Sequence, residues 1–382
     1  MHRYDILTKL IAGSFYLMRL FPIKKNKIAV VSFFGNGYGD NAKYVIDELL
    51  SQTKDYDIAW ITKKNGQCFP AGVRAVAYHS LKGIYEQCTA RVWIDNSRKP
   101  GYVRKRKGQY YINTWHGNTA LKKVEKDVEG VLPYYYVNAA KRDSKMVDVL
   151  LSSGKWDTQI YRNAFWYEGD IVECGYPRQD ILFQNDINQK AEIKRKLGIK
   201  KEDKVLLYAP TFRSGNRAGD ISVYSLDYKR VLNVLEQRFG GAWRGMVRLH
   251  PNVAALGSKL KIPSDIINVT DYPDMQELML IADCVISDYS SALVEAGAVG
   301  KCGFVFAVDF AEYMKERDVY FALEDLPFRI AKSNDELIEQ IKLFDESEYE
   351  EKSKHYYDDI CGINREGKAS KAVVDMIKKV TV

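Results

Sequence analysis

Residues 27–50 read KIAVVSFFGNGYGDNAKYVIDELL, and this stretch decides the fold class. Its first eight residues, KIAVVSFF, form a mainly apolar run, typical of a strand buried on both faces of a parallel sheet. Three glycines then interrupt the run, and residues 41–50 have the apolar spacing of a helix. A strand, a glycine-rich turn and a helix in this order predict one unit of a parallel α/β sheet with crossover helices.

The same alternation of short apolar runs and helical stretches continues along the chain and restarts after residue 175. Two blocks of similar size predict two Rossmann-like domains, residues 27–175 and 176–382, after a separate segment, residues 1–26. The length of 382 residues fits this division at about 150 residues per domain. Ligands of such sheets bind beyond the carboxyl ends of the strands, so we expect the site in the cleft between the domains.

Composition and charge exclude several classes of protein. Apolar residues make up 46% of the chain and charged residues 28%, which excludes general disorder. A net charge of +7 suits an anionic substrate or an anionic membrane surface, and is too weak to indicate nucleic acid. The six cysteines are scattered without CxxC spacing, which favours reduced thiols in a cytosolic protein over a structural zinc site.

The N-terminal segment has a distinct pattern. Residues 6–21 are mainly apolar, but Lys9 and Arg19 interrupt them, and the run is shorter than the roughly 20 residues of a membrane-spanning helix. A basic stretch with lysines at 24, 25 and 27 follows. Two hypotheses remain open: an amphipathic helix in the membrane interface, or a first helix packed on its own domain.

Polar clusters follow five of the predicted strands directly. They are Gly35–Asp40, Thr114–Asn118, Pro210–Arg213, His250–Pro251 and Asp288–Ser291. Because the carboxyl ends of parallel strands meet at one edge of a sheet, all five could face one cleft. The first cluster has G-x-G-x-G spacing and lacks the dinucleotide-binding spacing, which argues against an NAD-dependent enzyme. Because their clusters follow strands, three residues are candidates for the loops that line the cleft: Gly37, Asp40 and Asp288.

Two of the five histidines, His116 and His250, end strands in the two halves of the chain. Histidine is the side chain best suited to accept a proton near neutral pH, although one histidine alone is more often structural. Arg248 and His250 lie two residues apart on a predicted strand and so share a face, where both could contact phosphate oxygens.

Ser290 and Ser291 precede a predicted helix, where either could cap the N-terminus and help to bind an anion. Glu295 follows one turn later and could accept hydrogen bonds from ribose hydroxyls. The alternative is an ordinary capped helix with an exposed glutamate. The chain contains no HExxH, EF-hand, GxSxG or Walker sequence, so the sequence requires no tightly bound metal.

Seven segments together resemble a known family: FGNGYGDNAKYV (34–45), the Trp115-His116-Gly117 tripeptide, YRNAFWY (161–167), GYPRQDIL (175–182), YAPTFR (208–213), RLHP (248–251) and SDYSSALVEAG (287–297). In this order and spacing they are similar to the CDP-glycerol glycerophosphotransferases of the teichoic acid primase and polymerase type. The resemblance runs from about Lys27 to the C-terminus.

The resemblance implies a GT-B fold and a reaction. A glycerol phosphate or related polyol phosphate passes from a CDP-linked donor, CDP-glycerol or another CDP-polyol, to a hydroxyl of a lipid-linked saccharide or polymer, and CMP is released. It implies His116 and His250 as catalytic residues, and Ser290 and Ser291 as the phosphate site. It also implies the role of Glu295 at the donor and a peripheral location at the cytoplasmic face of the membrane. From the residues themselves we expect no tightly bound cofactor, and magnesium at most loosely bound.

From the residues themselves we expect His116 to be the general base, and Arg248 and His250 to hold the pyrophosphate. Thr211 and Arg213 either contact the donor or brace its loop. The loop after His116 reads HGNTALK where family members commonly read HGTPLK, so the identity of the acceptor stays open. Separately, Phe212 stands where family members often have Trp. Polymerases of this family often carry an extra N-terminal region, whereas this sequence holds little beyond one predicted catalytic unit. We therefore expect a primase-like or capsule-locus enzyme in preference to a long-chain polymerase.

Two rival functions remain. A GT-B glycosyltransferase with a nucleotide-sugar donor would share the fold, and screening of donors separates the two. An inactive nucleotide-binding scaffold at the membrane would not need His116 and His250.

Overall fold

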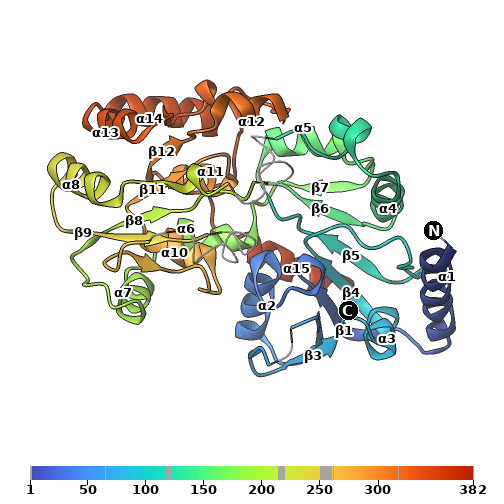
Figure 1. Cartoon of the computed structure of the whole chain (residues 1–382). Helices are drawn as coiled ribbons and strands as arrows, with labels where there is room; N and C mark the ends of the chain where they lie inside the picture. The colour runs from blue at the N-terminus through green and yellow to red at the C-terminus, as the bar shows by residue number, and fades with distance from the viewer. Residues whose placement is uncertain are drawn as a thin grey trace. The chain divides into compact units, whose positions relative to one another are not determined.

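The computed structural model describes residues 2–64, 66–117, 122–213, 220–249, 260, 262–316 and 318–381. The contacts divide these residues into two compact units. Unit 1 contains residues 2–117, 124–180 and 363–381, and unit 2 contains the described residues of 122–123 and 181–362. Figure 1 labels most of the helices and strands of both units.

Unit 1 contains a seven-stranded, entirely parallel sheet in the order β3-β2-β1-β4-β5-β6-β7. The strands are β1 (Lys24–Val31), β2 (Asp57–Thr62), β3 (Val73–Ala77), β4 (Ala90–Asp95), β5 (Tyr110–Asn113), β6 (Val149–Leu151) and β7 (Asp170–Val172). The helices are α1 (His2–Leu17), α2 (Asp40–Gln52), α3 (Leu81–Thr89), α4 (Tyr134–Ser144), α5 (Lys155–Ala164) and α15 (Ala369–Thr381). The strand order reverses between β1 and β4, and a ligand site is expected at such a reversal.

Unit 2 contains a six-stranded parallel sheet in the order β10-β9-β8-β11-β12-β13. The strands are β8 (Lys204–Tyr208), β9 (Trp243–Val247), β10 (Ile267–Asn268), β11 (Cys284–Ser287), β12 (Cys302–Phe306) and β13 (Arg329–Ala331). The helices are α7 (Ile187–Lys196), α8 (Tyr228–Phe239), α10 (Met275–Ile281), α11 (Ser291–Gly297), α12 (Phe310–Glu316), α13 (Asn334–Lys342) and α14 (Glu346–Lys354), and α6 (Asp180–Gln184) crosses from unit 1. Here the reversal lies between β8 and β11.

The core of unit 1 includes an element from the far end of the chain. Val373, Val374 and Ile377 of α15 are fully buried in one cluster with α2 and the central strands. Figure 1 shows α15, in red, beside the blue α2. The final helix was expected in the domain of residues 176–382, but its apolar face packs on the first sheet because that sheet has an apolar surface left to cover. The chain itself crosses at Asp180, close to the expected boundary at residue 175.

Helix α1 has two different faces. Phe15 is fully buried, and its carbonyl accepts a hydrogen bond from Cys88 Sγ of α3 at 3.5 Å. On other sides of the segment Leu10, Leu17 and Leu20 are 65%, 67% and 85% exposed. The segment is therefore packed on unit 1 and still presents apolar side chains to its surroundings. No helix in the described part of the chain is long and apolar enough to cross a bilayer.

Candidate active site

His116 lies just after β5, at the carboxyl edge of the unit 1 sheet. The backbone turns there: Trp115 has a φ of 52°, and its amide donates to Asn113 Oδ1 at 2.8 Å. The Thr114 amide donates to the Asp95 carbonyl at the end of β4, at 2.9 Å. These bonds direct the backbone out of the sheet, so the histidine follows a defined turn.

The ring of His116 is oriented by Asn96. His116 Nδ1 makes a short hydrogen bond with the Asn96 backbone carbonyl. Since a carbonyl only accepts, the proton of a neutral ring lies on Nδ1, which leaves the lone pair on Nε2. No hydrogen bond to Nε2 is found among the described residues. Phe33 packs against the ring, with the centroids 5.3 Å apart.

Burial lowers the pKa of His116 from its ordinary value, because a buried imidazole loses the hydration of its charged form. The hydrogen bond to Asn96 and the negative charge of Asp40 act in the opposite direction. The net effect is a lowered pKa, which favours the neutral ring that can accept a proton. A buried histidine with a free Nε2 can serve as a general base.

A polar network in unit 1 surrounds the His116 backbone. Arg178 Nη1 donates to the His116 carbonyl and to Asp40 Oδ2, both at 2.6 Å. Asn96 Nδ2 donates to Asp40 Oδ1 at 2.9 Å, and Asn41 Nδ2 donates to the Trp115 carbonyl at 3.0 Å. Asp40 thus connects the groups that position the histidine. The sequence placed Arg178 in a family motif without assigning it a role, and no sequence pattern pointed to Asn96.

Gly37 serves the packing of the loop after β1. Its φ is +114°, and a Cβ built there would lie 2.2 Å from Gln67 Oε1. Its carbonyl accepts a hydrogen bond from Trp60 Nε1 at 3.2 Å. Only glycine fits this close approach, so the packing of the loop accounts for Gly37 without a ligand.

Arg248 directly follows β9 in unit 2, and its amide donates to the Tyr208 carbonyl at 2.9 Å. Its Nη1 is buried and has no hydrogen-bond partner within the described part of the chain. Burial lowers the pKa of the Arg248 guanidinium, and the carboxylate of Asp274 partly offsets this. A buried guanidinium nitrogen without a partner is costly, so this group is suited to an anionic ligand.

Arg213 holds the loop after β8 in place. It makes ion pairs with Asp288 and Asp309, each at 2.7 Å, and donates to Thr211 Oγ1 at 2.8 Å. Burial acts to lower the pKa of Arg213, but the two carboxylates raise it above its ordinary value. Asp288 also accepts from the Thr211 amide at 2.9 Å. Of the two roles expected for Thr211 and Arg213, these contacts favour bracing the loop.

Ser290 is the N-cap of α11: its Oγ accepts a hydrogen bond from the Ala292 amide at 3.2 Å. Ser291 begins the helix, and both serines are half-buried. Glu295 is only 3% exposed, which excludes the alternative of an exposed glutamate. Gln276 Nε2 donates to Glu295 Oε2 at 2.7 Å, a contact that the sequence did not indicate.

His250 lies outside the described residues. Among the described residues, no three His, Cys, Asp or Glu side chains gather as metal ligands.

A family model matches this chain over residues 14–379, under the description CDP-Glycerol:Poly(glycerophosphate) glycerophosphotransferase. The chain is 31% identical over 394 residues to a teichoic acid glycerol-phosphate transferase of Staphylococcus aureus, covering 98% of this chain and 99% of that protein. It is also 31% identical over 370 residues to a teichoic acid poly(glycerol phosphate) polymerase of Staphylococcus epidermidis, covering 94% of this chain. This chain spans about half, 51%, of that polymerase.

Among solved structures, the wall teichoic acid polymerase TagF matches with a TM-score of 0.83 and 31% identity, over 100% of this chain and 96% of that chain. A variant of that polymerase was solved after a soak with CDPG. With two parallel sheets covered by helices, the match confirms the α/β fold of the GT-B class that the sequence predicted.

Proposed function

The chain belongs to the CDP-glycerol:poly(glycerophosphate) glycerophosphotransferase family, and we propose that it transfers glycerol phosphate from CDP-glycerol to an acceptor hydroxyl in teichoic-acid-type polymer synthesis. The match over residues 14–379 and the TagF likeness support this reaction. The observation that carries it within the chain is His116, whose Nδ1 is held by a backbone carbonyl while Nε2 is left to accept a proton.

In the proposed reaction, the acceptor oxygen attacks the phosphorus that bears the glycerol. A new P–O bond forms, the P–O bond to CMP breaks, and CMP leaves with the electron pair. His116 Nε2 takes the proton of the acceptor hydroxyl. The barrier falls mainly because the reactants are positioned and phosphate charge is neutralised.

We propose that the residues that bind the CDP-linked donor lie on unit 2. Arg248, with its buried and unpartnered Nη1, binds the pyrophosphate together with His250. Ser290 and Ser291 bind the leaving phosphate, and Glu295, oriented by Gln276, accepts a hydrogen bond from the ribose. Thr211, Arg213 and Asp288 keep the neighbouring loop in shape, and Asp40 does the same near His116.

The acceptor is proposed to be a lipid-linked saccharide or polymer, met at the cytoplasmic face of the membrane. The support is the surface of the α1 segment, where Leu10, Leu17 and Leu20 are exposed close to a basic stretch. Exposed apolar groups beside lysines favour reversible binding to anionic lipid. Membrane binding is thus proposed as peripheral.

The decisive experiment measures CMP release. Full-length protein is incubated with a lipid-linked acceptor and, in parallel, CDP-glycerol, CDP-ribitol and a UDP-sugar. CMP release only with a CDP-polyol supports the proposal, whereas UDP release from the UDP-sugar supports the glycosyltransferase. Absence of release from every donor would favour the inactive scaffold.

A parallel reaction in EDTA should keep part of the activity if any magnesium is only loosely bound.

A further inference from the structure

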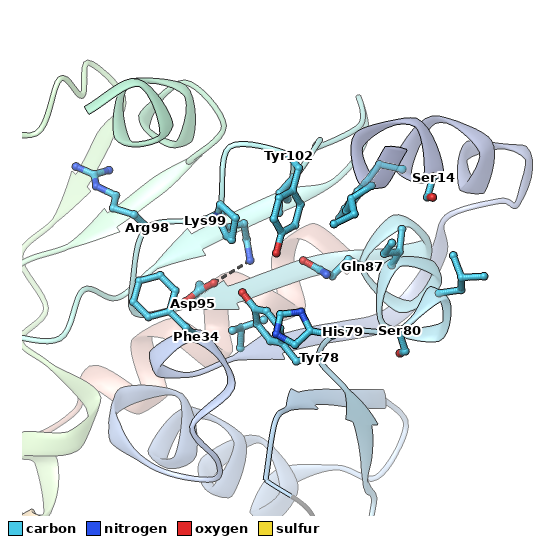
Figure 2. A pocket seen from close by; sticks show the side chains of 17 residues that line it. Ser14, Phe34, Tyr78, His79, Ser80, Gln87, Asp95, Arg98, Lys99 and Tyr102 are labelled. Carbon is cyan, nitrogen blue, oxygen red and sulfur yellow. Dashed lines mark hydrogen bonds and ion pairs between the residues drawn. The ribbon is translucent and has the colours of Figure 1, made fainter. Parts of the chain in front are cut away.

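A cavity of about 590 Å³ lies in unit 1 between α1, α3 and the segments that follow β1 and β4 (Figure 2). Its volume is within the range of about 300–1,000 Å³ that small-molecule sites occupy. No residue proposed above for the transfer reaction lines it. Its walls are mainly apolar, with Ile11, Phe15, Val31, Phe34, Ile84 and Val103 among the lining residues.

The charged side chains at this cavity are already paired. Lys99 Nζ lies 2.8 Å from Asp95 Oδ2, and both side chains are 3% exposed. Arg98 pairs with Glu125 at 3.0 Å, and Figure 2 shows it directed away from the side chains around the cavity. An anionic ligand would therefore find no free countercharge among these groups, which favours an uncharged occupant.

Most of the uncharged polar groups are satisfied within the chain as well. Ser14 Oγ donates to the Leu10 carbonyl at 3.2 Å, and Gln87 Nε2 donates to the Gly83 carbonyl at 3.3 Å. Ser80 Oγ donates to the Ala77 carbonyl at 2.6 Å and accepts from the Gly83 amide at 2.9 Å. A saccharide depends on hydrogen bonds to the protein and would gain few here, whereas a hydrocarbon chain needs none.

The cavity is continuous with exposed apolar surface. Helix α1 supplies one wall through Ile11 and Phe15, while Leu10 and Leu17 of the same helix are 65% and 67% exposed. Leu81, at the start of α3, lines the cavity and is 64% exposed, so it marks the rim. Exposed apolar groups around a cavity are typical of a site that meets lipid.

We propose that this α1 cavity binds the hydrocarbon chain of a membrane lipid. The inference rests on the membrane association proposed above, and it assigns an occupant to a part of unit 1 that the transfer reaction does not use. The chain can come from a bulk phospholipid or from an isoprenoid lipid, since both have the apolar chemistry that the cavity recognises.

The test is photolabelling of the full-length protein with two probes. One is phosphatidylglycerol that carries a diazirine in its acyl chain, presented in vesicles. The other is a water-soluble farnesyl phosphate that carries a photoreactive group at the end of its chain. Mass spectrometry of the peptides should locate adducts on residues 8–23 and 78–103. Labelling by the first probe identifies a bulk lipid, and labelling by the second alone identifies an isoprenoid.

Two tryptophan variants of α1 provide a matched pair. Ser14→Trp places an indole at the cavity, so labelling of its peptides should fall severalfold. Gly13→Trp places the same side chain one residue away, where a Cβ meets nothing within 4 Å, so labelling should persist. A third variant, Leu81→Glu, places a charge at the rim and should reduce labelling too. Thermal melts of each variant confirm that it is folded.

The outcomes separate this inference from the proposed function. Equal labelling of Ser14→Trp and Gly13→Trp, or adducts elsewhere with both probes, overturns the cavity site. Vesicle sedimentation without adducts at the cavity leaves membrane association intact and overturns this inference. Cavity adducts with farnesyl phosphate support it even in a protein that does not sediment with vesicles. Titration with CDP-glycerol tests the donor site independently and should be unchanged by Ser14→Trp.

Discussion

At the scale of single residues, His116 is the side chain that we propose takes the proton of the acceptor hydroxyl. His116→Ala removes the Nε2 acceptor but leaves unit 2 untouched. Loss of a general base typically lowers turnover about 10²–10⁴-fold, so we expect kcat to fall by that amount. The measurement is CMP release, with titration of CDP-glycerol as the control. Turnover within tenfold of the unaltered protein would show that another group takes the proton.

The pH dependence follows from the environment of the same residue. A general base works in its neutral form, so kcat/KM rises as pH rises through the His116 pKa. Burial lowers this pKa from its ordinary 6.5, so the acidic limb should have its midpoint below pH 6.5. Asp40→Asn removes a negative charge that raises the pKa, so the midpoint should move to still lower pH. A midpoint that Asp40→Asn moves upward would contradict this account.

Substitutions of Ser290 and Ser291 should differ in their effect on protein stability, although both should weaken the binding of CDP-glycerol. Ser290 caps α11, so Ser290→Ala should lower the free energy of unfolding by about 1 kcal/mol as well as weaken CDP-glycerol binding. Ser291 caps nothing, so Ser291→Ala should weaken binding alone. Calorimetric titration and thermal melts on both variants measure the two effects. Unchanged affinity in both variants would place the leaving phosphate elsewhere.

At the scale of elements, α1 packs on unit 1 through Phe15 and also presents exposed apolar side chains, so variants of its two faces test both hypotheses that the sequence left open. Phe15 is fully buried, so Phe15→Ala should lower the free energy of unfolding by about 3–5 kcal/mol. Leu17 is 67% exposed, so Leu17→Ser should leave stability nearly unchanged and reduce sedimentation with anionic vesicles. Chemical unfolding and vesicle sedimentation are measured on both variants. A helix that serves only as core would sediment equally well with Leu17→Ser.

Elements also show where sequence patterns succeed. Short apolar runs mark β2, β8 and β11, because a buried parallel strand needs nearly every residue apolar. The first strand was expected at residues 27–34, but it begins at Lys24 and ends at Val31. Strands β6, β7 and β13 have three residues each, which is too short for a pattern to emerge.

At the scale of the whole molecule, the last helix belongs to the first fold unit. Val374 of α15 is fully buried in the core of unit 1, so Val374→Asp places an unpaired carboxylate there and should prevent cooperative folding of that unit. Lys371 on the same helix is exposed and pairs with Asp375 at the surface, so Lys371→Asp should change stability by less than about 1 kcal/mol. Circular dichroism melts compare the two. Equal melts would contradict the packing of α15 on the first sheet.

The sequence by itself determined the α/β class, the two parallel sheets and the positions of His116, Ser290 and Ser291 after strands, because periodicity and strand ends are local properties. Arg248 was expected on a strand, but it directly follows β9. The tertiary structure alone decided what those residues contact. Asn96, Arg178 and Asp40 reach the His116 segment from three distant parts of the chain, and Arg213 is held by Asp288 and Asp309. It also placed α15 on the first sheet. Hydrogen bonds, ion pairs and burial depend on which segments pack together, and a linear pattern does not contain that information.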